Sequence, residues 1–177
     1  DAEYDGGPFA PNRFHRTDRV GDTNRVSIGI DSQVLDSVTE KQWFQVGLAQ
    51  MLYFSDRKVR AEVGPGAAPL TDRVSDLFGN VGVSLTDEVS TSAEAVWDWE
   101  NEEISSATWR LDYRGRGRQA ELSYVHEESK EQIAAEFIVP LTPRLLGSFK
   151  NVYSLKRSES LYTGFSLGYD SCCWAVQ

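Results

Sequence analysis

Residues 105–113 read SSATWRLDY, and this stretch decides the fold. From Ser106 to Tyr113 polar and apolar side chains alternate without exception. Successive side chains of a β-strand point to opposite faces, so a period of two predicts a strand with one polar and one apolar face.

The same alternation recurs along the chain in segments of about ten residues, with turn residues between them. The segments are 25–35, 42–54, 75–85, 89–99, 105–113, 118–126, 132–139, 145–155 and 161–169, with room for a tenth from Trp174. No segment has convincing helical periodicity. The sequence therefore predicts an all-β fold, an antiparallel up-and-down meander of about nine strands.

A soluble β-sandwich has the same period, with one face in a core and one in water. Two features favour a fragment of a large transmembrane outer-membrane β-barrel instead. Segments of about 9–11 residues suit a tilted crossing of a bilayer, whereas sandwich strands are nearer 5–6 residues. The polar sides also carry residues that suit a water-filled lumen, namely Asp31, Asn80, Glu94, Arg110, Asp112, Glu121 and Glu136.

Aromatic residues near the segment ends are a third feature that favours a barrel. Each hairpin reverses the chain, so successive strand ends alternate between the two sides of a membrane, and we call this strand parity. If the long link after residue 54 faces outward, strand parity gives an outer group of Phe54, Trp97, Trp99 and Tyr124 and a periplasmic group of Tyr113 and Tyr169. Two such groups would form lipid-facing girdles, because amphipathic rings favour both interfaces of a membrane. The same parity predicts short turns on the periplasmic side and longer loops outside.

Charge and hydropathy argue against a nucleic-acid-binding protein and against a helical membrane protein. The net charge of −9 makes the chain a poor partner for nucleic acid. No apolar run approaches the roughly 18 residues of a membrane helix. The chain opens on Asp1 without a signal peptide, so we expect a removed signal or an internal fragment.

The two cysteines, Cys172 and Cys173, are adjacent. A bond between neighbours would be strained, since their Cα atoms lie about 3.8 Å apart, below the usual disulfide span. Either each has a partner elsewhere or both are reduced thiols.

No motif points to an enzyme or a cofactor. No G-x-S-x-G occurs, and the run from His126 to Ser129 is not a zinc motif. His15 and His126 lack ligand spacing. We expect no catalytic residues, no cofactor and no metal.

Three stretches, in order, carry a family resemblance. They are NRF at 12–14 with DRVGDTNR at 18–25, GLAQMLYFSDR at 47–57, and GYDSCCWAV at 168–176. Together they resemble the lipopolysaccharide-assembly family LptD, also called OstA or Imp, over about residues 12–177. The alternatives are another outer-membrane barrel of the porin kind and a soluble β-sandwich binding domain.

The resemblance implies an integral outer-membrane barrel that inserts lipopolysaccharide into the outer leaflet. It implies an LptE-like lipoprotein plug, and an LptA-like periplasmic bridge that docks on an N-terminal jellyroll. It also implies disulfides from Cys172 and Cys173 to partners outside this chain. Residues 1–177 would be part of a single C-terminal barrel domain, with the jellyroll and the last strands absent.

Overall fold

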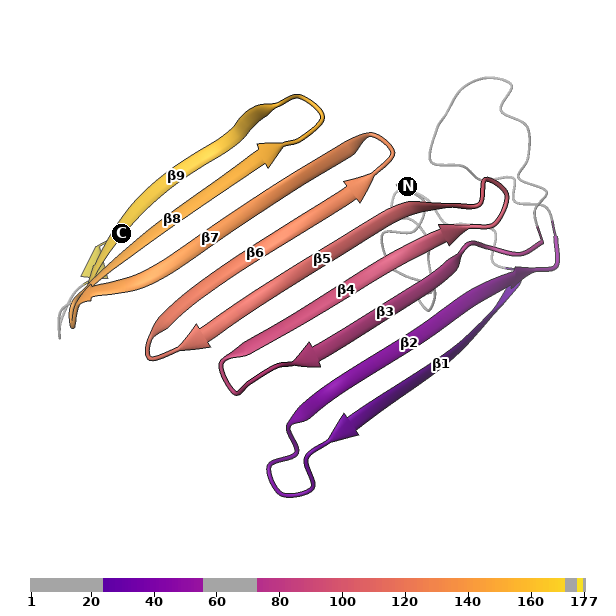
Figure 1. Cartoon of the computed structure of the whole chain (residues 1–177), viewed down its shortest axis with the longest axis horizontal. Coiled ribbons are helices and arrows are strands. Elements are labelled where there is room, and N and C mark those ends of the chain that lie inside the picture. Colours follow the sequence, from indigo (N-terminus) through magenta and orange to yellow (C-terminus); the bar gives the residue numbers. More distant parts are fainter. Residues whose placement is uncertain (1–23, 56–72, 171–174, 177) are drawn as a thin grey trace.

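The computed structural model describes residues 24–55, 73–170 and 175–176, and these form one antiparallel sheet. Its ten strands lie side by side in sequence order, in a single layer (Figure 1). They are β1 (Arg25–Leu35), β2 (Gln42–Tyr53), β3 (Leu77–Ser84), β4 (Val89–Asp98), β5 (Glu103–Gly115), β6 (Arg118–Glu127), β7 (Lys130–Thr142), β8 (Leu145–Ser154), β9 (Glu159–Asp170) and β10 (Ala175–Val176). The all-β meander predicted from the alternation is confirmed.

The sheet has two rims, where the strands turn. Rim A comprises the turns 36–41, 85–88, 116–117 and 143–144. Rim B comprises the described ends of the β2–β3 link, 54–55 and 73–76, and the turns 99–102, 128–129 and 155–158. Turns of two residues occur at both rims, so among the described connections length does not separate an outer from a periplasmic side.

The backbone angles and side-chain hydrogen bonds of the turn residues determine where the hairpins close. Arg116 and Gly117 both have positive φ, 52° and 73°, as a two-residue type I′ hairpin requires. At rim B the Asp98 carboxylate accepts hydrogen bonds from the backbone N–H groups of Glu100 (2.7 Å) and Asn101 (3.1 Å). This is the Asx-type turn that aspartate favours.

The strands differ from the predicted segments chiefly at their ends. β7 runs from Lys130 to Thr142, beyond the alternating segment 132–139, because the pairing of β7 with β6 and β8 continues where the side-chain pattern stops. A register shift between Val152 and Tyr153 places Leu161 at an irregularity of β9. The alternation that grouped Leu161 with Phe165 therefore does not hold there.

Cross-strand register defines the two faces, because residues directly opposite each other in a sheet share a face. The apolar face carries a continuous row from β2 to β8: Val46, Val81, Ala93, Trp109, Tyr124, Ile133 and Tyr153. Most of the exposed large hydrophobic side chains lie on this face. Within the described residues no second layer covers it, so the Val, Leu and Trp rows do not meet across the dry interior of a sandwich.

The buried hydrophobic side chains lie on the opposite, polar face, near rim B. Met51 is 0% exposed, Tyr53 is 4% exposed and Ala49 is 8% exposed. Ser75, also buried, donates its N–H to the Met51 carbonyl and accepts the Met51 N–H on its Oγ. No helix within the described ranges is long and apolar enough to cross a membrane.

Candidate functional site

All seven polar residues singled out from the sequence fall on one face of the sheet. The first three form a row across β1 to β4: Asp31 lies opposite Gly47, Gly47 opposite Asn80, and Asn80 opposite Glu94. Thr108 of β5 continues this row, so the alternation along β5 puts Arg110 and Asp112 on the same face.

Gly47 lets the Asp31 and Asn80 side chains close over the middle of this row. A Cβ at position 47 would lie 3.0 Å from Asp31 Oδ2 and would overlap Asn80 Oδ1. Gln45 Nε2 donates a hydrogen bond of 3.1 Å to Asp31 Oδ2. The polar face is thus bridged side chain to side chain across strands, in a way that a larger residue than glycine would obstruct.

A second row crosses β5 to β8, and we call it the charged row. Asp112 lies opposite Glu121, Glu121 opposite Glu136, and Glu136 opposite Lys150. Directly opposed carboxylates repel each other in a sheet. Neighbouring cations must therefore offset this repulsion.

Three bases on the same face do so. Arg110 Nε lies 3.8 Å from Glu121 Oε1, Lys150 Nζ lies 2.9 Å from Glu136 Oε2, and Arg114 Nη2 lies 3.2 Å from Asp112 Oδ1. Because these pairs are partly exposed, each contributes only about 0.2–1 kcal/mol. Sequence reasoning missed Lys150, because only the register shows that it faces Glu136. It missed Arg114 because the predicted strand ended at residue 113, whereas β5 continues to Gly115.

The aromatic residues predicted for the girdles lie toward the two rims of the sheet. Phe54 directly follows β2, and Trp97 and Trp99 lie at the rim-B end of β4. Tyr124 points its hydroxyl toward the same rim, where it donates a 2.8 Å hydrogen bond to Glu131 Oε1. Contact with lipid at this level stays a prediction.

The periplasmic group lies near rim A. Tyr113 lies opposite Val89 and Ala120, and Tyr169 lies opposite Leu145. Both tyrosines lie on the apolar face of the sheet. Their membrane role, too, stays a prediction.

An aromatic ladder on the apolar face was missed from the sequence. Phe137, Phe149 and Phe165 lie opposite one another on β7, β8 and β9. Their ring centroids are 6.4 Å and 4.8 Å apart. The alternation within each strand does not indicate this ladder, because only the strand register brings the three rings together.

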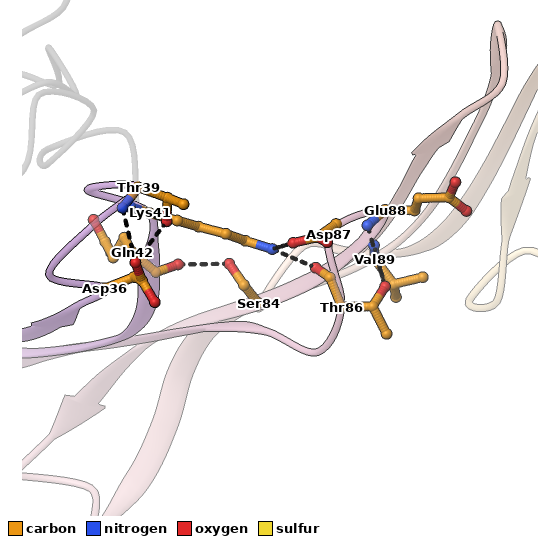
Figure 2. Close-up of polar contacts among 9 residues, drawn as sticks. All are labelled: Asp36, Thr39, Lys41, Gln42, Ser84, Thr86, Asp87, Glu88 and Val89. Atoms are coloured by element: carbon orange, nitrogen blue, oxygen red, sulfur yellow. Dashed lines mark hydrogen bonds and ion pairs between the residues drawn. The ribbon is translucent and has the colours of Figure 1, made fainter.

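Rim A has a polar clasp between two consecutive hairpins (Figure 2). From the first turn, Lys41 Nζ reaches Asp87 Oδ1 at 2.6 Å and the Thr86 carbonyl at 2.9 Å in the second. Ser84 Oγ donates to the Gln42 carbonyl at 2.7 Å beside it. The clasp ties the ends of β2 and β3 together where their ladder of backbone pairs begins.

The clasp depends on the shape of turn 36–41, which Asp36 fixes. Its Oδ1 accepts hydrogen bonds from the Thr39 N–H (2.8 Å), the Val38 N–H (2.9 Å) and the Thr39 hydroxyl (2.9 Å). These bonds favour the ionised carboxylate, so the backbone N–H of Thr39 first, then that of Val38, hold the pKa of Asp36 below its ordinary value of 3.8.

This shift predicts an acid-sensitive turn. Because the folded-state pKa lies below 3.8, the contribution of Asp36 to stability is present above that pH and is lost as the pH falls through the lowered pKa. Carboxyl-carbon NMR should give a midpoint for Asp36 below 3.8. Thr39→Val should raise the midpoint only partly, since both backbone donors remain. Thr86→Val in the neighbouring turn should not move it, and a midpoint at or above 3.8 in the unaltered chain would contradict the turn geometry.

Two of the sequence-predicted residues, Cys172 and Cys173, lie outside the described residues. Across the described ranges no group of three or more His, Cys, Asp or Glu side chains is arranged to hold a metal ion. The candidate site consists of the two surfaces of the sheet, one charged and one apolar.

The chain is similar to a known protein family and to individual members of it. The family model for LptD, LPS transport system D, matches residues 3–139. The chain is 27% identical over 171 residues to LPS-assembly protein LptD of Thiobacillus denitrificans and 29% identical over 173 residues to that of Nitrosococcus oceani. Each match covers 96% of this chain but 23% of the relative, so the chain spans about a quarter of the length of these relatives. Since the family model covers most of the 177 residues, the chain belongs to the LptD family, the D component of LPS transport.

Proposed function

We propose that this chain forms part of the wall of an outer-membrane β-barrel that assembles lipopolysaccharide in the outer leaflet. The observation that carries the proposal is the contrast between the two faces of one sheet. One face exposes rows of Val, Leu, Phe and Trp with no covering layer among the described residues, and the other carries the charged row.

The polar face of the sheet is suited to water, and the apolar face is suited to lipid. Charged side chains inside hydrocarbon are costly, so the face with Glu121, Glu136 and Lys150 belongs in water. The apolar face would be a large exposed hydrophobic patch in water but is well solvated by lipid. A barrel wall with lipid outside and a wet lumen inside satisfies both faces at once.

The individual roles follow from the faces. Asp31, Asn80, Glu94, Arg110, Asp112, Glu121 and Glu136 line the lumen, where they keep a polar path hydrated. Phe54, Trp97, Trp99, Tyr113, Tyr124 and Tyr169 contact lipid at the two interfaces. A porin-like barrel would have the same faces, and membership of the LptD family favours lipopolysaccharide as the cargo.

The sheet is one section of a larger barrel. Within the described residues β1 pairs with β2 alone, and β9 is paired on its outer side only through two residues of β10. An unpaired edge in hydrocarbon leaves backbone groups without hydrogen bonds, each costing several kcal/mol. Further strands must therefore close the wall, and the chain belongs to a single barrel domain with them.

The remaining expectations rest on the family resemblance. An LptE-like lipoprotein plug would lie against the polar face. An LptA-like bridge would deliver lipopolysaccharide through a jellyroll, and Cys172 and Cys173 would form disulfides with cysteines outside this chain. The names of the relatives describe transport and assembly, so we assign no enzymatic reaction.

Photo-cross-linking in living cells tests the face assignment and the cargo together. A photoreactive amino acid at Glu94 or Glu121 of the full-length protein should capture lipopolysaccharide. The same probe at Ala120, one residue before Glu121 on the apolar face and toward rim A, should capture phospholipid of the inner leaflet rather than lipopolysaccharide. Capture of lipopolysaccharide equally from both faces, or from neither, would contradict the proposed lumenal path.

A further inference from the structure

Two turns of rim A are basic, although the chain as a whole is acidic. The β5–β6 turn reads RGRGR over residues 114–118, and Arg144 lies in the β7–β8 turn at the same rim. Neither stretch, 113–120 or 140–147, contains an Asp or Glu. The other two turns of rim A, 36–41 and 85–88, carry Asp36, Glu40, Asp87 and Glu88 against Lys41, and the Glu88 carboxylate lies against Gly115. The turns of rim B and the adjoining strand ends have no such basic stretch, since they carry Asp98, Glu100, Glu102, Glu103, Glu127, Glu128, Glu131 and Glu159 against Lys130, Lys156 and Arg157.

The two basic turns are fixed in place and lie close together. The positive φ angles of Arg116 (52°) and Gly117 (73°) hold the β5–β6 turn in its tight form. A Cβ built at Gly117 would lie 3.9 Å from Pro140 Cγ, at the rim-A end of β7. The arginines are therefore displayed on a defined backbone.

Register puts Arg118 on the lipid side of the sheet. It lies opposite Gly115. This pair is two residues beyond the pair Tyr113–Ala120 on the apolar face, so Arg118 lies on the apolar face as well. Arg114, one residue before Gly115, has the opposite parity and lies beside Asp112 on the polar face. Arg116, Arg118 and Arg144 are exposed, and within the described part of the chain none of the three forms an ion pair.

A guanidinium on a lipid-facing surface must reach the headgroup layer, because it cannot remain in hydrocarbon. The anion available at that depth is the phosphate of a phospholipid, which arginine can bind through two parallel N–H···O bonds. We propose that Arg116, Arg118 and Arg144 form a binding surface for anionic phospholipid headgroups at rim A. This inference rests on the proposed function, since it requires the apolar face to lie in a bilayer.

Native mass spectrometry of the full-length protein in detergent micelles tests the proposal, with phosphatidylglycerol and phosphatidylcholine as probes. The unaltered protein should bind phosphatidylglycerol more tightly. The triple variant Arg116→Gln/Arg118→Gln/Arg144→Gln should weaken that binding by on the order of a hundredfold, at about fivefold for each arginine near a membrane surface. Arg114→Gln is the matched control, because its guanidinium lies on the polar face, and it should change little.

Three outcomes would contradict the proposed binding surface. The unaltered protein could bind both lipids with equal affinity, or the triple variant could lose no more affinity for phosphatidylglycerol than Arg114→Gln does. The third is displacement of the lipid by equimolar inorganic phosphate. A β-sheet circular dichroism spectrum shows that each variant is folded. Reconstitution separates the two proposals. Protein that enters vesicle bilayers without preferring phosphatidylglycerol refutes this surface alone, whereas protein that does not enter bilayers at all refutes the barrel.

Discussion

Replacing Ala93 with arginine in the full-length protein should lower the free energy of unfolding in a phospholipid bilayer by about 2–4 kcal/mol. Ala93 lies near the middle of β4 on the apolar face, opposite Val81 and Trp109. In a barrel wall this position is close to the bilayer midplane. An arginine there either stays in hydrocarbon or thins the membrane around it, and both are costly.

Glu94→Arg is the matched control. Glu94 is the next residue along β4, is exposed, and lies on the polar face opposite Asn80 and Thr108. An arginine at this position remains in water, so the free energy of unfolding should change by less than about 0.5 kcal/mol. Urea titrations of both variants, folded into the same bilayers, measure the difference. Equal losses at the two positions would mean that the faces do not meet different solvents.

Replacing Met51 with alanine should cost about 2–5 kcal/mol, the range for large-to-small substitutions at fully buried positions. The Met51 side chain is 0% exposed, and its Sδ lies 3.3 Å from Arg25 Nη1 and 3.6 Å from the Tyr53 hydroxyl. Its removal leaves a cavity between protein groups, which lipid cannot enter from the opposite face. Met51→Leu, which nearly conserves volume, should cost less than about 1.5 kcal/mol.

Leu52→Ala provides the comparison on the apolar face. Leu52 lies opposite Val26 and is only partly exposed, but in the proposed barrel lipid chains would fill the space that its truncation leaves. The measured loss should therefore be smaller than that for Met51→Ala in the same urea titration. A larger loss at Leu52 would place the packed interior on the apolar face, as in a sandwich, and would argue against the barrel.

Much of the fold could be predicted because its pattern is local. Alternation located β1 to β9 to within a few residues, since side chains two apart in a strand must share a face. Parity also placed Tyr113 and Trp97 at opposite rims, because each hairpin reverses the chain. The polar residues proposed for the lumen share a face for the same reason.

The contacts between strands could not be predicted in this way. Nothing within β8 alone indicates that Lys150 faces Glu136, or within β7 to β9 that three phenylalanine rings form a ladder. The burial of Met51 was missed as well, because alternation assigned it to a polar face that should be wet. The net charge of the whole chain also gave no sign of the two basic turns of rim A, because acidic residues at both rims outnumber the basic ones.

The sequence by itself determined where most strands lie, which side chains within a strand share a face and which family the chain resembles. Only the tertiary structure decided the register, and with it the ion pairs of the charged row, the position of Arg118 beside the lipid-facing residues and the clasp from Lys41 to Asp87. The physical reason is that period two arises within a single strand. Register is set between strands, by backbone hydrogen bonds and turn geometry, and a slip of one residue would exchange every partner and every face.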